Sequence, residues 1–294
     1  MRILQIIVFF LIAFPLSAGD ADEAKKNILG RFTDGVSSAF GGLTSFDGIK
    51  RADLEIDSKN QDFESDVRAS IITSLSEDEA NKSFWLNQTN FSTQDDRETF
   101  NTGFIFRRLS EDNKWLSGFN LFYDHELDYD HQRASFGIEI KSTPIEFNAN
   151  NYARISSDKT IGSSTERAMD GFDIEVGLQV PYMPTSKLFV SGYEWSGSDY
   201  DIKFGNKIGL RLRPSSSLEI ELGAEDNNQW RDYKATAKIQ FIKRIGERIP
   251  DSGLYFSDKA FEFKDMSGEI YEKVRRQNRI VRTVAGTVTI ARGT

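Results

Sequence analysis

The chain has 294 residues, no cysteine and a formal net charge of -8 at pH 7. This length is sufficient for one large domain, and without cysteine neither a disulfide framework nor thiol chemistry is available. The acidic balance argues against a protein that binds nucleic acid by neutralising phosphates, although a basic face is compatible with an acidic total.

The N-terminus has the pattern of a secretory signal peptide. A positively charged start is followed by an apolar run over residues 3–16 and then by small residues. This order predicts a signal peptide over residues 1–19, cleaved near Ala18 or Gly19. The alternative is an N-terminal membrane anchor, for which the apolar run is short. Residues 20–44 follow as a predicted periplasmic lead-in, partly helical.

Alternation of apolar and polar residues follows along most of the chain and is clearest over residues 171–182. Successive side chains of a strand point to opposite faces, so this segment has one apolar and one polar face. Its apolar face consists of Phe172, Ile174, Val176, Leu178, Val180 and Tyr182. About twelve segments share the pattern, with lengths near the ten residues that a tilted strand needs to cross a bilayer. These predicted strands cover residues 45–57, 63–75, 82–93, 98–109, 114–125, 132–142, 145–156, 171–182, 186–196, 203–213, 217–225 and 232–242.

The apolar faces meet either lipid or a protein core. We predict an all-β protein, a transmembrane antiparallel β-barrel of about 12 strands over residues 45–242, because the strands are long for a sandwich and tight turns alternate with longer polar loops. The alternative is a secreted soluble sandwich or lipocalin-like barrel whose apolar face points inward. Aromatic residues near strand ends suit interfacial girdles or ordinary packing at strand ends. They are Trp85, Trp115, Tyr123, Tyr182, Trp195 and Tyr233.

The character of the chain changes after the last predicted strand. That strand starts at Tyr233 and ends on the aromatic Phe241, the pattern of a membrane-insertion signal. Residues 245–257 are irregular, and residues 265–274 predict a short capped helix, acidic early and followed by arginines. Residues 280–290 return to strand-like alternation.

No group of residues predicts catalysis or a metal site. His125 and His131 are separated by acidic residues, but their spacing fits no standard metal motif, and a solvated turn between two strands explains them. The acidic pairs Glu219/Glu221 and Asp95/Asp96 lack any sign of the separated pKa values that a glycosidase needs. We therefore expect no enzyme activity, no cofactor and no bound metal.

The middle of the chain carries a run of residues that resembles a known family. The run 115–124, followed by 131–133 and 136–139, resembles the β-domain of the intimin/invasin family, the inverse autotransporters, as do residues 147–152, 170–173 and 274–281. The motif residues are Trp115, Gly118, Asn120, Phe122, Tyr123, Asp124, His131, Gln132, Arg133, Gly137 and Glu139.

The resemblance implies a twelve-stranded outer-membrane barrel with its N-terminus in the periplasm. In this family the segment after the barrel passes back through the lumen and carries a C-terminal passenger, often immunoglobulin-like adhesin repeats, to the cell surface. Residues 243–294 would then be a plug and linker with a short helix and a displayed stub. Implied partners are outer-membrane lipid and lipopolysaccharide, periplasmic chaperones and the barrel-assembly machinery, with no nucleic acid.

Two departures limit the resemblance. Residues 20–44 leave no room for a peptidoglycan-binding module, and no adhesin repeats precede Thr294. We therefore expect a passenger that is absent or minimal, and no receptor is assigned. A truncated gene and a general outer-membrane pore are the alternatives.

The basic residues of the tail have a predicted role in this arrangement. We expect Arg275, Arg276 and Arg279 to dock the plug in an acidic lumen, rather than to bind anionic lipid or nucleic acid. The predicted polar-face carboxylates are those of Glu139, Glu146, Glu175, Glu219 and Glu221.

Overall fold

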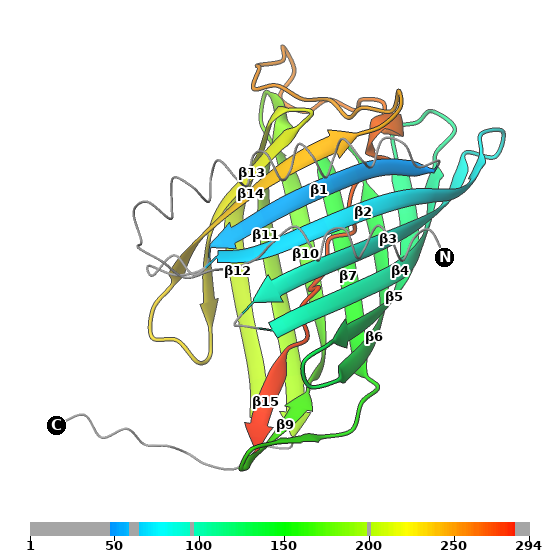
Figure 1. Cartoon of the computed structure of the whole chain (residues 1–294). Coiled ribbons are helices and arrows are strands. Elements are labelled where there is room, and N and C mark those ends of the chain that lie inside the picture. Colours follow the sequence, from blue (N-terminus) through cyan, green and yellow to red (C-terminus); the bar gives the residue numbers. More distant parts are fainter. Residues whose placement is uncertain (1–47, 59–64, 95–96, 199–200, 286–294) are drawn as a thin grey trace, which may run out of the picture.

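The computed structural model describes residues 48–58, 65–94, 97–198 and 201–285. In this part of the chain twelve antiparallel strands close into a barrel (Figure 1). Around the barrel they are β1 (Ile49–Ser58), β2 (Ser65–Asp78), β3 (Ser83–Gln94), β4 (Arg97–Leu109), β5 (Leu116–Glu126), β6 (His131–Lys141), β7 (Ile145–Arg154), β10 (Asp170–Val180), β11 (Met183–Ser198), β12 (Asp201–Ser215), β13 (Leu218–Asn227) and β14 (Lys234–Arg244). Pairing of β14 with β1, with Phe241 opposite Leu54, closes the sheet. Closure leaves no free strand edge to expose unpaired backbone groups to lipid.

The predicted barrel of about 12 strands is confirmed. Two short strands were not predicted, β8 (Lys159–Ile161) and β9 (Ser164–Ala168), and they pair with a third, β15 (Arg282–Ala285), in the order β15-β9-β8. β8 and β9 lie between the strands predicted over residues 145–156 and 171–182, and β15 lies in the segment 280–290 for which strand-like alternation was predicted. The predicted signal peptide and the lead-in over residues 20–44 are outside the described residues.

The two faces of each barrel strand meet different surroundings. On β10, Phe172 is 46% exposed and Leu178 51%, whereas Gln179 is 2% exposed on the lumen side. The apolar set therefore points outward, which excludes the soluble barrel, whose apolar set points inward. No helix of the described residues is long and apolar enough to span a membrane.

The two ends of the barrel differ. At the end where β14 finishes, here called the turn end, consecutive strands join through residues 142–144, 181–182 and 216–217. The opposite end, the loop end, carries β8 and β9 within the connection from β7 to β10 (Figure 1, bottom). A chain that leaves β14 thus starts at the turn end.

Candidate functional site in the barrel lumen

The C-terminal part of the chain runs through the barrel from one end to the other (Figure 1, orange to red). Residues 245–266, the rim segment, follow the turn end, and residues 267–281, the lumen segment, descend inside the barrel. β15 then pairs with β9 at the loop end, with Arg282 opposite Ala168 and Val284 opposite Glu166. The route places polar strand faces around an extended chain.

The helix predicted over residues 265–274 is wrong. Among the described residues of that stretch only Ser267–Glu269 form a single 3-10 turn. The guanidinium of Arg107 donates hydrogen bonds of 2.5 Å to the carbonyl oxygens of both Ile270 and Glu272. Because those carbonyls are bound by the barrel wall, a continued helical hydrogen-bond ladder is not needed to satisfy them.

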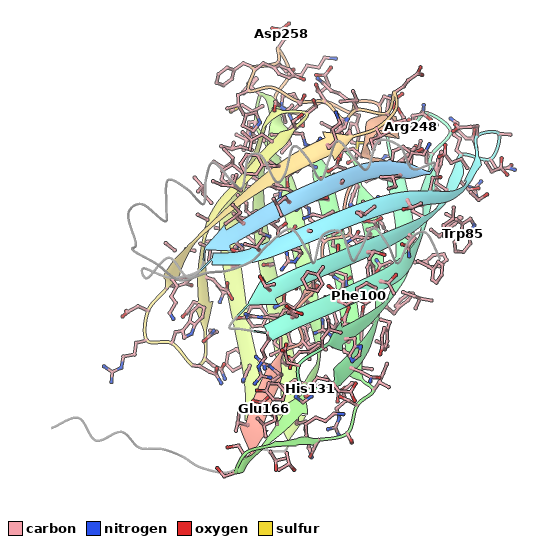
Figure 2. The ribbon with its side chains drawn as sticks, viewed as in Figure 1. Trp85, Phe100, His131, Glu166, Arg248 and Asp258 are labelled. Atoms are coloured by element: carbon pink, nitrogen blue, oxygen red, sulfur yellow. The ribbon has the colours of Figure 1, made fainter. Side chains whose placement is uncertain are left out.

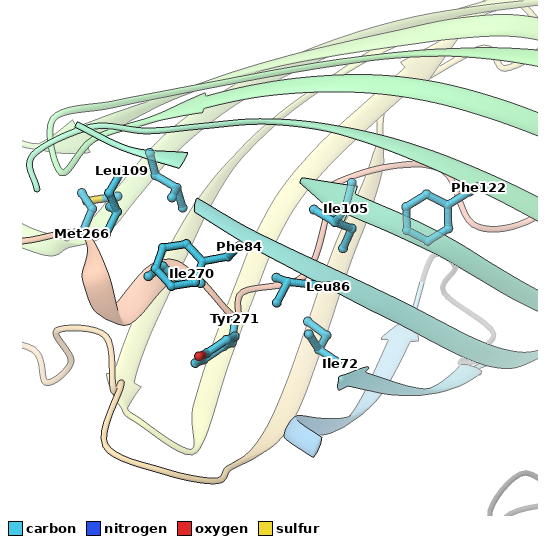
Figure 3. Close-up of a cluster of buried hydrophobic side chains, with 11 residues drawn as sticks. Ile72, Phe84, Leu86, Ile105, Leu109, Phe122, Met266, Ile270 and Tyr271 are labelled. Carbon is cyan, nitrogen blue, oxygen red and sulfur yellow. The ribbon is translucent and has the colours of Figure 1, made fainter. Parts of the chain in front are cut away.

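An apolar cluster holds the beginning of the lumen segment (Figure 3). The lumen segment contributes Ile270, Tyr271 and Val274, and Met266 joins them from the end of the rim segment. The wall contributes Ile72, Phe84, Leu86, Ile105, Leu109, Leu116 and Phe122. Burial of one such side chain contributes about 1.5–3 kcal/mol. The sequence did not predict this cluster, because β2 to β5 carry apolar residues on both faces and their alternation is weak.

Glu272 and Lys273 make the next contacts. The Glu272 carboxylate binds Arg51 and lies 2.5 Å from an Arg244 nitrogen and 3.6 Å from one of Arg213. Lys273 binds Glu55 at 2.5 Å. An isolated buried charge is unfavourable, so these partners make the segment's position specific. Residue type alone did not single out Glu272.

The tail arginines face carboxylates of the wall. Arg275 lies 3.2 Å from Glu219, 3.8 Å from Glu146 and 3.9 Å from Glu175. The side chain of Arg276 is fully buried and donates to both Asp124 oxygens at 2.7 and 2.9 Å. Its guanidinium also lies 4.3 Å from the centre of the Phe122 ring.

The remaining predicted partners act differently. Glu139 binds Arg107, the residue that holds two carbonyls of the lumen segment. Glu221 binds two residues of β12, Arg211 at 3.0 Å and Lys207 at 2.7 Å. Arg279 lines a lumen cavity of about 460 Å³ beside the segment.

Polar side chains of the wall also bind the main chain of the lumen segment. Asn150 donates to the carbonyl of Arg275 at 2.9 Å, and Arg133 to that of Gln277 at 2.7 Å. The backbone N–H of Gln277 in turn donates to the Tyr152 hydroxyl at 2.7 Å. Further bonds link Asn101 to the Asn278 carbonyl and the Val274 N–H to Gln88. Main-chain contacts of this kind recognise an extended polypeptide whatever its side chains.

Two motif glycines make room for these contacts. A Cβ on Gly137 would lie 2.2 Å from Asn150 Oδ1 and 2.7 Å from Asn120 Nδ2. A Cβ on Gly118 would lie 3.0 Å from Glu139 Oε1 and 2.6 Å from the Phe106 carbonyl oxygen. Glycine therefore lets the amide and carboxylate side chains approach the wall.

The motif residues divide between the two faces. Gly118, Asn120, Phe122, Asp124, His131, Arg133, Gly137 and Glu139 share the lumen parity of β5 and β6. Trp115 is exposed outside the barrel, and Tyr123 and Gln132 share its outward parity.

His131 was predicted to lie in a solvated turn, and that prediction is wrong. It begins β6, is completely buried, and its Nε2 lies 3.4 Å from Glu166 Oε2 of β9 (Figure 2). Glu166 also binds Arg97 at 2.8 Å and lies 3.6 Å from Arg282 of β15. The lumen wall, the β8–β9 hairpin and the emerging segment are thus joined by charge at the loop end.

The aromatic residues near strand ends divide between the two explanations left open for them, interfacial girdle and ordinary packing. Trp195 is 3% exposed and packs inside against Tyr152, with ring centres 4.9 Å apart, so it belongs to no girdle. Trp85, Trp115 and Tyr182 are exposed at the turn end, and Tyr233 is exposed in the loop before β14. Phe241 also points outward, and its role with Tyr233 as an insertion signal stays a prediction.

The described residues contain no group of three or more His, Cys, Asp or Glu side chains arranged to hold a metal ion. His125, near the end of β5, hydrogen-bonds Asp130 of the following turn at 2.9 Å. Glu219 and Glu221 are both engaged by Arg211, and Asp95/Asp96 lie outside the described residues. The lumen is built to bind a peptide chain through hydrogen bonds and ion pairs.

The fold and the lumen define a β-barrel of the bacterial outer membrane that encloses its own C-terminal segment. A sequence profile of the inverse autotransporter β-domain matches residues 15–278. The chain therefore belongs to the inverse autotransporter β-domain family, and the resemblance read from the sequence is confirmed.

Curated relatives agree with this assignment. An attaching and effacing protein homologue of Escherichia coli K12 is 32% identical over 119 residues, 40% of this chain and 37% of the relative. The inverse autotransporter adhesin YeeJ of the same strain is 26% identical over 214 residues, 67% of this chain and 9% of the relative. Invasin of Yersinia enterocolitica is 28% identical over 103 residues, 34% of this chain and 12% of the relative. The matched regions thus cover less than two fifths of each of these relatives.

A chain solved in a study of in-meso crystallization of membrane proteins has a TM-score of 0.67 and 18% identity. The match covers 80% of this chain and 99% of that one. At this identity the likeness concerns the fold.

Proposed function

We propose that this barrel anchors in the outer membrane and exports its own C-terminal segment to the cell surface, with the turn end in the periplasm. The observation that carries the proposal is the lumen segment, which extends from the turn end to β15 at the loop end. Arg107, Asn101, Asn150 and Arg133 bind its main chain, a mode of binding that suits a passing polypeptide of any sequence.

The ion pairs give the export a defined end point. Three charged residues of the lumen segment pair with opposite charges, each at its own place on the wall. The pairs are Glu272 with Arg244, Arg275 with Glu219 and Arg276 with Asp124, so only one register of the segment satisfies all of them. Pairing of β15 with β9 then fixes the chain where it emerges. In this proposal Arg275, Arg276 and Arg279 are the docking residues of a plug that closes the lumen.

The proposed role is mechanical and not enzymatic. Its partners are outer-membrane lipid and lipopolysaccharide, periplasmic chaperones and the barrel-assembly machinery. The insertion signal is the stretch from Tyr233 to Phe241, most of which belongs to β14. Relatives named adhesin and invasin suggest a displayed passenger involved in adhesion, whose receptor we do not assign.

An epitope tag after Thr294 tests the proposal. On intact cells the tag should bind antibody, whereas the same tag inserted at Ser216 in the turn between β12 and β13 should bind only after the outer membrane is permeabilised. A tag after Thr294 that stays hidden until permeabilisation would overturn export.

The second candidate function is a general pore. The 460 Å³ cavity along the lumen segment favours it, because this space would let water and small ions pass beside the plug. Single-channel conductance separates the two, since a docked plug keeps the current low.

A further inference from the structure

The rim segment carries apolar side chains that face away from the barrel. Phe261 is 56% exposed and Phe263 47% exposed. Ile249, Leu254 and Phe256 are exposed in the same segment. A cluster of exposed apolar residues in so short a stretch is typical of a binding surface.

Hydrogen bonds to the barrel turns fix the rim segment. The Gly253 N–H donates to the Arg213 carbonyl at 2.9 Å, and the Tyr182 N–H donates to the Ala260 carbonyl at 2.9 Å. Farther along, the Lys264 N–H donates to Thr143 Oγ1 at 3.1 Å. The segment thus runs along the turn end past three successive connections between strands. These bonds hold its main chain on the barrel while its apolar side chains stay exposed.

The outer side continues the lipid-facing surface of the barrel. Phe263 packs against Trp115, with ring centres 5.7 Å apart. On the outer wall near the same end, Trp85 and Phe119 form a further aromatic pair, with ring centres 6.0 Å apart. Aromatic side chains at this position are typical of the boundary between headgroups and acyl chains.

We infer that the rim segment is an interfacial membrane anchor, which inserts Phe261 and Phe263 at the headgroup boundary of the leaflet around the turn end. Residues 245–266 contain three basic and five acidic residues, so attraction to anionic lipid does not account for binding. The insertion rests on apolar area. That the leaflet is the inner one rests on the proposed function, because the turn end is periplasmic only if the C-terminus is exported outward.

Anchoring would act on the start of the lumen segment. The rim segment leads directly into Met266 and Ile270, which pack in the apolar cluster inside the wall. Holding Phe261 and Phe263 in lipid therefore fixes the place from which the chain turns into the barrel.

Site-directed spin labelling tests the anchor, and the absence of cysteine makes single labels simple. Variants F261C and F263C carry a nitroxide in liposomes of phosphatidylethanolamine and phosphatidylglycerol. The lipid control is L178C on the outer wall of β10, and the water control is D258C at the outermost point of the turn end (Figure 2). Heat-modifiable gel migration verifies that each variant is folded.

The readout is the ratio of collisions with oxygen to collisions with a water-soluble nickel chelate. At residues 261 and 263 this ratio should match that of L178C, and it should not change with salt or with the fraction of anionic lipid. Ratios like that of D258C would overturn the anchor. Lipid-like ratios that disappear when the protein is diluted in lipid would also overturn the anchor, because they indicate contact with a second copy of the chain. Protection of the labels only in native outer membranes would overturn it as well, because it indicates a protein partner. The collision ratios of the labels do not depend on whether the C-terminus is exported. The anchor can therefore be refuted while the tag experiment still supports export, and the reverse.

Discussion

Replacement of Arg276 by Met should release the lumen segment. The fully buried Arg276 side chain donates two hydrogen bonds to Asp124 and a third, of 2.8 Å, to Ser135. Removal of one partner of a buried ion pair costs about 3–5 kcal/mol. Asp124 keeps Arg133 at 2.8 Å and Asn101 at 2.8 Å, so we expect the lower end, about 3 kcal/mol. At about 1.4 kcal/mol per factor of ten, the undocked population rises roughly a hundredfold.

Recordings in planar lipid bilayers measure this change as the fraction of time in the open state. Open time should rise about a hundredfold for Arg276→Met by the arithmetic above and further for Arg276→Glu, which places a carboxylate beside Asp124. Arg276→Lys should be intermediate because it keeps the charge without the two-bond geometry. The matched control is Arg231→Met, at an exposed arginine in the loop before β14. Unchanged open time in both Arg276→Met and Arg276→Glu would refute docking by this residue.

Two further predictions concern the wall and the rim. Gly137→Ala should destabilise the barrel by about 1–3 kcal/mol in urea unfolding, because the new methyl displaces Asn150. The control Gly192→Ala should leave the stability unchanged, because its Cβ meets nothing closer than 3.8 Å. Equal losses of stability in the two variants would contradict the packing argument. At the rim, burial raises the pKa of Asp251, but hydrogen bonds from Lys264 and Tyr255, together with the positive charge of Lys264, outweigh burial and lower the pKa below its usual range. This contact contributes stability above the unfolded pKa of about 3.9 and loses it as pH falls through the lower folded value. The mobility of a spin label at S252C should therefore rise only in acid. When Asp251→Asn is added, the mobility should be high at every pH. A mobility of the S252C label that does not change with pH while Asp251 is present would contradict the prediction.

Alternation with a period of two determined the barrel before any contact was known. Phe172 and Leu178 point outward and Gln179 inward because neighbouring side chains of a strand must point to opposite faces. The sequence also determined the family, because the residues from Trp115 to Glu139 keep their order and spacing. Where both faces of a strand are apolar, as around Leu86 and Ile105, alternation does not distinguish the lumen face from the lipid face. The apolar cluster in the lumen was therefore not predicted.

Tertiary structure decided which charges meet and how the lumen segment is shaped. The acidic lumen was predicted, but Asp124 as the partner of Arg276 depends on barrel closure and strand register, which bring together residues 152 positions apart. The same contacts decided against the predicted helix, because Arg107 binds the carbonyls of Ile270 and Glu272. The burial of His131 beside Glu166 likewise follows from the return of the hairpin over the loop end. Local pattern fixes the direction in which a side chain points, whereas its neighbours depend on the path of the whole chain.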